Sequence, residues 1–253
     1  MKPKLSILFI SALVVAGQAA GQSDAEAACK PVAQITAFEG QVSVKPAGKV
    51  VKKSPGKLPA ALCAGDEVHT FQGKALIAAK QDKITVDADS VLTLNPNEQV
   101  TVGKGQALFD IQKRQTGRGI QIATRLSVIG VKGTRFLVSD KPEGVAVALD
   151  EGVVDVKSTK GKLGLYREKE VVKQPPMDFE AFKRQVQEGV EAEKKAFEEY
   201  KKELVREFVA YVDSVTMQAG TELVISGGEA TERKTSGNMK NEMDELRKWQ
   251  TAR

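Results

Sequence analysis

Few residues of this chain have the types and spacing needed for chemistry. His69 is the only histidine, so any serine or cysteine triad would have to use it, and no Gly-x-Ser-x-Gly turn is present. A glycosidase pair of carboxylates would need a sugar cleft, but aromatic residues make up only 5% of the chain. The Gly65-Asp66 and Asp87-Ala88-Asp89 segments have too few ligands for a calcium loop. We therefore expect no catalytic, cofactor-binding or metal site, a protein that is not an enzyme, and a surface turn at His69.

The first residues have the order of a secretory signal peptide. Lys2 and Lys4 precede a mostly apolar run from Leu5 to Val15, and small residues follow it. We expect residues 1–20 to be removed, with further cleavage sites as late as residue 27, because the run is too short for a transmembrane helix. Lipid attachment at Cys29 is an alternative, although Glu26 stands where lipoproteins carry a Leu-like residue. The sequence thus predicts a periplasmic or secreted protein.

Export to an oxidising compartment bears on the state of the two cysteines. Cys29 and Cys63 are the only ones, and an oxidising compartment favours a disulfide between them. Neither a C-x-x-C spacing nor additional ligands point to redox or metal chemistry. The disulfide would close a loop of about 35 residues and stabilise the fold by about 3–4 kcal/mol in the loop-entropy model.

The charge pattern argues against nucleic acid as a partner. The formal net charge of +5 falls to about +3 once Lys2 and Lys4 are removed, and both signs are interspersed along the chain. One segment, from Gly48 to Lys57, is locally basic. It is either a solvated hairpin tip or a binder of anionic polymer, with Lys52 and Lys53 as candidate contact residues.

Short alternating segments separated by turn residues fill the chain from about residue 31 to 166. Alternation of this kind places Val, Ile and Leu on one face, and its recurrence every 8–12 residues or so predicts an all-β domain, either solenoid-like or sandwich-like. We place this domain at residues 29–168. The segments that carry the prediction are 41–44, 75–78, 83–86, 91–94, 99–102, 107–111, 120–122, 136–138, 145–147 and 153–156.

A different pattern follows Pro175-Pro176. Apolar residues recur in steps of three and four from Phe179 to Val215 among many Glu and Lys residues, which predicts one long amphipathic helix over 178–219. Its apolar stripe would pack on the β-domain, form a coiled coil with a second copy, or dock on another protein or a membrane. Candidate contact residues on the stripe are Phe197, Tyr200, Leu204 and Phe208. Residues 220–253 are expected to form a short strand (221–225) and a polar, partly disordered tail.

The β region contains three motifs in a fixed order. They are Gly65 and Asp66 of a Gly-Asp turn, then Gly133, Thr134 and Phe136 of a Gly-Thr-x-Phe element, and finally Glu151 and Gly152 of a Glu-Gly-x-Val strand. This order of motifs resembles the FecR domain. The likeness covers about residues 32–157 and implies a β-domain that binds proteins. In the regulators that name the family, a cytoplasmic sigma-factor-binding segment and a transmembrane helix precede this domain. This chain is more similar to the stand-alone secreted members.

Three functions follow from these observations. The first is a non-catalytic envelope module that binds an envelope protein, with the helix used for docking or for forming a homo-oligomer. The second is a binder of anionic glycan or lipopolysaccharide through the basic segment. The third is an accessory role in a FecR-like surface-signalling system. None of them requires a cofactor.

Overall fold

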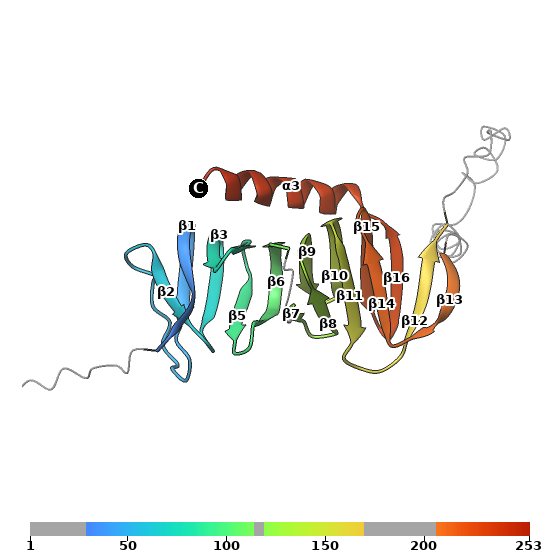
Figure 1. Ribbon diagram of the computed structural model, residues 1–253, viewed down its shortest axis with the longest axis horizontal. Coiled ribbons are helices and arrows are strands. Elements are labelled where there is room, and N and C mark those ends of the chain that lie inside the picture. Colours follow the sequence, from blue (N-terminus) through green and yellow to red (C-terminus); the bar gives the residue numbers. More distant parts are fainter. Residues whose placement is uncertain (1–28, 114–118, 170–205) are drawn as a thin grey trace, which may run out of the picture.

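The described part of the chain folds into an elongated sheet with a helix lying across it. The computed structural model describes residues 29–113, 119–169 and 206–253. Sixteen strands of these residues join into one continuous sheet, and the helix α3 (Gly237–Thr251) follows the last strand. The strands stand in a row along the long axis of the molecule (Figure 1). The mainly β fold predicted from the sequence is confirmed.

Eleven strands in the described ranges form one hydrogen-bonded path, which we call the long layer. All neighbours along it are antiparallel except β12 and β16, which are parallel. The order is β13 (Arg206–Val212), β12 (Leu163–Glu168), β16 (Glu229–Lys234), β15 (Thr221–Ser226), β10 (Gly144–Glu151), β9 (Thr134–Lys141), β6 (Gln99–Ile111), β4 (Asp82–Val86), β3 (Glu67–Ala79), β1 (Pro31–Lys45) and β2 (Ala60–Cys63).

The other five strands form a short layer beside it. They are β5 (Val91–Asn95), β7 (Ile120–Ala123), β8 (Ser127–Val131), β11 (Val153–Ser158) and β14 (Ser214–Gln218). The long strands β3 and β6 connect the layers, because one half of each pairs with β5 and the other half with β4. The predicted strands 99–102 and 107–111 are thus two halves of β6, and Gly105 lies between them at φ +80°.

One hydrophobic core fills the space between the layers. Each layer contributes the inward-facing positions of its alternating strands, which is the arrangement of a sandwich. Phe109 of β6 and Phe136 of β9 lie at its centre, fully buried, with their rings stacked at a centroid distance of 5.1 Å. The alternation seen in the sequence therefore places the apolar side chains in a shared interior.

The helix α3 covers the outer face of the long layer. Its buried residues Met239, Met243 and Leu246 follow the spacing of one helical face and contact Leu108, Leu137 and Ala148 of the sheet. In Figure 1 the helix runs along the sheet from β15 toward β1. The Ser236 side chain caps its first turn by accepting a hydrogen bond from the backbone N–H of Met239.

The predicted long helix is wrong in its last part. Residues 206–212 form β13 and residues 214–218 form β14. The steps of three and four that suggested a helix end in a stretch where Val215 and Met217 alternate with polar residues, and alternation is the strand period. Both side chains are buried in the core of the sandwich. The rest of the predicted helix, residues 178–205, lies outside the described residues, as does the predicted coiled coil.

The prediction for the C-terminal tail also needs correction. The expected strand at 221–225 is present as β15, but the residues after it are ordered as β16 and α3 rather than as a partly disordered tail. Polar composition misled the prediction because only one face of α3 is buried, and that face is mostly two Met residues and one Leu. Consequently the β structure extends well beyond residue 168.

Candidate functional site

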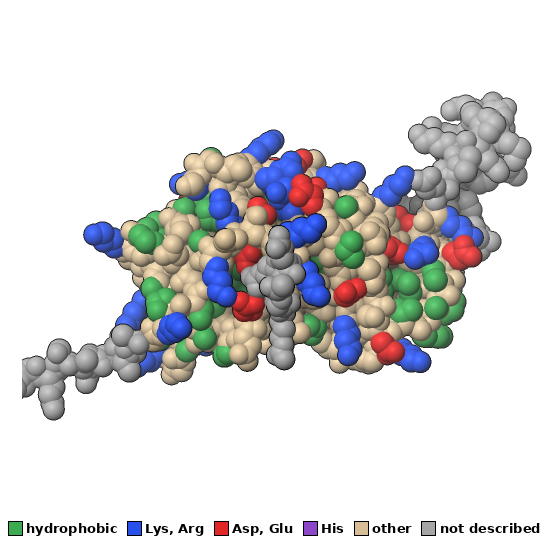
Figure 2. Space-filling model, viewed as in Figure 1, with side chains coloured by type: hydrophobic (Ala, Val, Ile, Leu, Met, Phe, Trp, Pro, Cys, Tyr) green, Lys and Arg blue, Asp and Glu red, His purple; other side chains and the backbone are tan. Residues whose placement is uncertain are grey.

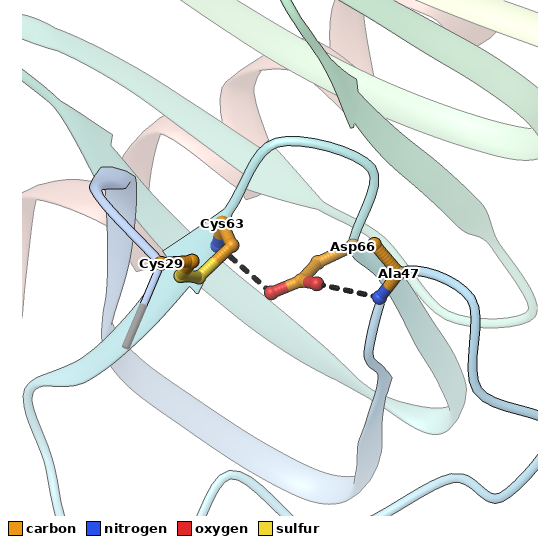
Figure 3. The surroundings of a disulfide bond; sticks show 4 residues. All are labelled: Cys29, Ala47, Cys63 and Asp66. Carbon is orange, nitrogen blue, oxygen red and sulfur yellow. Dashed lines mark hydrogen bonds between the residues drawn. A yellow bond between two sulfur atoms is a disulfide. The ribbon is translucent and has the colours of Figure 1, made fainter. Parts of the chain in front are cut away.

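The Gly-Asp turn between β2 and β3 holds a neighbouring loop in place. Gly65 has φ +92°, and a Cβ there would lie 2.8 Å from the Cβ of Ala47, so only glycine fits. The buried carboxylate of Asp66 accepts hydrogen bonds from the backbone N–H groups of Ala47 at 2.9 Å and Cys63 at 2.8 Å (Figure 3). This carboxylate therefore ties the segment after β1 to the end of β2.

The disulfide lies directly beside this carboxylate. Cys29 and Cys63 are bonded with their Cα atoms 6.1 Å apart, across a sequence separation of 34 residues (Figure 3). The predicted disulfide is confirmed. We call Cys29, Cys63 and Asp66 the clamp, because together they fix the segment before β1, the end of β2 and the segment after β1.

The clamp supports a basic loop, which we define as residues 46–59 between β1 and β2. Its base is closed by two backbone hydrogen bonds between Val44 and Lys53, of 2.7 and 2.8 Å. Beyond this base, Val50 is 91% exposed and Val51 is 67% exposed. Both candidate contact residues, Lys52 and Lys53, belong to this loop and are exposed.

His69 takes part in a chain of polar contacts at the edge of the loop. It lies within β3, with a side chain only 12% exposed, so the expected surface turn is wrong. Its Nδ1 is 3.2 Å from Lys52 Nζ and its Nε2 is 3.0 Å from Glu67 Oε2. With the ring proton on Nε2, the imidazole accepts from Lys52 and donates to Glu67.

Glu67 in turn binds Lys45, with 2.7 Å between Oε1 and Nζ. The hydrogen bond from Lys45 lowers the pKa of Glu67 below 4.5; burial opposes this shift and His69 supports it. These ion pairs and hydrogen bonds connect Lys52 of the basic loop to β3 and to Lys45 at the end of β1.

The remaining motif residues meet at two adjacent turns. Gly133 and Gly152 have φ +113° and +88°, and a Cβ on Gly152 would lie 2.5 Å from the Thr134 Cγ2 methyl. Glu151 pairs with Arg135 at 3.1 Å across the β9–β10 ladder. Phe136, on the same strand as Thr134, points into the core. These residues therefore build the sandwich, as their turn and packing chemistry suggests.

The family comparison agrees with these two motif clusters. Residues 66–155 match the family model described as FecR protein. This segment is a FecR domain. It runs from the clamp carboxylate Asp66 to Asp155 in β11, so β1, β2 and all elements from β12 onward lie outside the match. The sheet of this protein thus continues past both ends of its FecR domain.

The other comparisons add little about this chain. No curated protein matches the chain. Two crystal structures, each described as a candidate anti-sigma factor from Parabacteroides distasonis, match with TM-scores of 0.42 and 0.41 at 13% and 12% identity. The matches cover 68% of this chain and only 61% of those chains. This similarity is too low to carry a function over.

An exposed aromatic surface lies beyond the FecR domain, on β12 and β13. Phe208 is 46% exposed and Tyr211 is 71% exposed. The Phe208 ring packs edge-on against Tyr166 at 5.5 Å and against Tyr211 at 5.2 Å, and Arg206 stacks over Tyr166 at 4.6 Å. Gly164 lies beneath all three rings. We call Tyr166, Arg206, Phe208 and Tyr211 the aromatic surface.

The aromatic surface occupies one end of the sheet. Its strand β13 pairs only with β12 in the described part of the chain. Figure 2 shows hydrophobic side chains gathered at this end of the molecule. The charged residues of Arg206–Val212 are the first two, and its remaining five residues are Phe, Val, Ala, Tyr and Val, so most of this strand lacks the charges and prolines that protect an edge. A register shift between Leu165 and Tyr166 interrupts its pairing with β12.

Of the predicted contact residues on the C-terminal stripe, the structure describes one. Phe208 lies on the aromatic surface, while Phe197, Tyr200 and Leu204 fall outside the described residues. Within the described ranges, no group of three or more His, Cys, Asp or Glu side chains is placed to hold a metal ion. None of the helices there is long and apolar enough to cross a bilayer.

Sequence reasoning missed three features of these sites. The adjacent Val50 and Val51 among lysines carried a signal, since turns seldom pair two β-branched apolar residues. The face of α3 was readable from the spacing of Met239, Met243 and Leu246. No local signal pointed to the aromatic surface, because Tyr166 and Tyr211 come together only through the pairing of β12 with β13.

Proposed function

We propose that this protein is a non-catalytic interaction module of the bacterial envelope, which binds a protein partner through the aromatic surface. The observation that carries the proposal is the cluster of Tyr166, Phe208 and Tyr211 at the end of the sheet, in which Phe208 and Tyr211 are exposed and Tyr166 is partly buried. Tyr, Phe and Arg are enriched at the centres of protein interfaces, where they supply most of the binding energy. The FecR domain then acts as the rigid body that carries this surface.

The disulfide supports a compartment outside the cytoplasm. A bond between Cys29 and Cys63 is stable in an oxidising environment and rare in the cytosol. Together with the signal-peptide pattern at residues 1–20, it supports a periplasmic or secreted location. The mature N-terminus, measured by mass spectrometry of the protein purified from its envelope, tests this part of the proposal. An N-terminus at Met1 would contradict it.

Site-specific photo-crosslinking in intact cells tests partner binding. A photoreactive amino acid at position 211 should give a discrete adduct, and the same amino acid at Val153 serves as the control, because Val153 is 48% exposed on the other layer. Phe208→Asp should abolish the adduct while leaving the melting temperature within a few degrees. Equal adducts from both positions, or an adduct that survives Phe208→Asp, would contradict the proposal.

The FecR match supports a more specific version of this function. Because the family takes its name from regulators with a sigma-factor-binding segment, the bound partner would be a component of a surface-signalling system, and this chain would act as its accessory. Expression of the signalling target genes in a strain carrying Phe208→Asp measures this. Unchanged induction in a strain that has lost the crosslink would separate partner binding from signalling.

The basic loop supports a second candidate function, the binding of anionic glycan or lipopolysaccharide. Lys49, Lys53 and Lys57 project from it without a carboxylate partner among the described residues. A polymer held by lysines alone should dissociate steeply as salt rises, because exposed charges are screened within about 8 Å at physiological ionic strength. Retention on an immobilised anionic polysaccharide at increasing salt measures this.

A further inference from the structure

The basic loop combines two chemistries at one exposed tip. Val50 and Val51 are 91% and 67% exposed. Four lysines surround them in residues 46–59, and the same segment holds no Asp or Glu. We infer that this loop docks the protein on an anionic lipid surface, with the two valines entering the headgroup layer and the lysines contacting lipid phosphates.

The charge of the loop is available to an external ligand. Lys52 is engaged, since its Nζ contacts His69 and lies 5.4 Å from the centre of the Phe71 ring. Lys49, Lys53 and Lys57 have no carboxylate partner in the part of the chain that the structure describes. Two acidic groups beside the loop already have partners inside the fold: Asp66 accepts from two backbone N–H groups, and Glu67 pairs with Lys45. The loop therefore presents uncompensated positive charge.

The valines distinguish a lipid surface from a soluble polyanion. A glycan chain held by charge offers no apolar environment, so exposed valines would contribute nothing to binding it. At a bilayer, affinity grows with the apolar area that enters the interface and with the attraction of basic residues to anionic lipids. The observed pairing of apolar tip and basic flanks matches the second case.

The clamp prepares the loop for this role. Asp66 holds the segment at Ala47, the Val44–Lys53 hydrogen bonds close the base, and the disulfide fixes the adjoining end of β2. A loop held at its base loses less conformational freedom when it binds. The basic loop lies beside β1 and β2, whereas the aromatic surface lies on β13 at the opposite end of the sheet. A membrane and a protein partner would thus bind at separate ends.

Co-sedimentation of the purified full chain with lipid vesicles tests the inference. We expect binding to vesicles of phosphatidylglycerol and phosphatidylethanolamine, and none to vesicles of phosphatidylcholine. Lys49→Gln/Lys53→Gln should weaken binding by about tenfold or more. Val50→Ser/Val51→Ser, which leaves the charge unchanged, should also weaken it by about tenfold. The matched control is Lys157→Gln/Lys160→Gln, two exposed lysines in β11 and in the bend that follows it, which should bind like the unaltered protein.

Each alternative outcome overturns the inference. Absence of binding to anionic vesicles would do so, as would binding that neither loop variant reduces. If the valine variant binds vesicles and a soluble anionic polysaccharide as tightly as the unaltered protein does, the ligand is a polyanion rather than a lipid surface. Phe208→Asp, measured in parallel, should sediment normally, so failure of the lipid inference remains distinguishable from failure of partner binding.

Discussion

Replacement of Asp66 by alanine should destabilise the whole domain through the clamp. The buried carboxylate accepts two backbone hydrogen bonds, at 2.9 Å from Ala47 and 2.8 Å from Cys63. Hydrogen bonds to charged groups contribute about 1.5–3 kcal/mol each. Water can replace the partner of Ala47, which is an exposed residue, but less readily that of Cys63. We therefore expect the free energy of unfolding to fall by about 2–3 kcal/mol.

Thermal unfolding followed by circular dichroism measures this loss. For a chain of this size, about 2–3 kcal/mol corresponds to a melting temperature lower by about 5–10 °C. Asp155→Ala is the matched control, because that carboxylate is exposed and accepts one hydrogen bond, from Thr216 at 2.7 Å. It should lower the melting temperature by no more than about 2 °C.

The same variant gives a local readout. Hydrogen exchange should accelerate in residues 44–59 of Asp66→Ala before it does so in β9 and β10, because the lost bonds hold the base of the basic loop. If Asp66→Ala melts within about 1 °C of the Asp155→Ala control, or if exchange in residues 44–59 is unchanged, the carboxylate does not clamp the loop and this reasoning is refuted.

Three further predictions concern stability. Leu246→Ala should lower the free energy of unfolding by about 2–5 kcal/mol and speed hydrogen exchange in α3, because the Leu246 side chain is 1% exposed where it packs on the long layer. An unchanged exchange rate in α3 would contradict this packing. Burial alone would raise the pKa of Glu222, but hydrogen bonds from Arg233 and the Ser236 backbone N–H outweigh it and hold the pKa below 4.5. The ionised Glu222 therefore stabilises the fold above pH 4.5, and this contribution is lost as the pH falls through the folded-state pKa. In urea titrations, the midpoint of Glu222→Gln should decline less steeply below pH 4.5 than that of the unaltered protein. An equally steep decline would contradict this. Cys29→Ser/Cys63→Ser should lower the free energy of unfolding by about 3–4 kcal/mol in urea titrations, and an unchanged midpoint would show that the bond adds nothing.

The sequence predicted the β-sandwich well because its strands carry a strong local signal. Alternating apolar residues such as Val100 and Val102 mark both the strand and the face of it that is buried in the sandwich core. The FecR-type turns were equally predictable, because Gly65, Gly133 and Gly152 lie at positions that require positive φ. The local pattern did not show that a strand continues through a glycine, so the two halves of β6 were predicted as separate strands.

The C-terminal third was harder to predict for a physical reason. Phe208, Tyr211 and Val215 are spaced in threes and fours, which satisfies a helix, yet pairing with β12 and β11 makes the same residues strands. Tertiary pairing outweighs a local period when the period is ambiguous. The aromatic surface, which depends on this pairing, was for the same reason invisible in the sequence.

The helix α3 also determines the order in which the molecule can fold. Its Gln250 accepts a hydrogen bond from Thr85, 165 residues earlier, and Arg253 pairs with Glu39, 214 residues earlier. Contacts so distant along the chain make folding slow. The FecR domain is synthesised long before α3, and until then Leu108 and Leu137 face solvent. This face of the sheet stays uncovered until the fifteen residues of α3 have been synthesised, and chains truncated before Gly237 should aggregate through it.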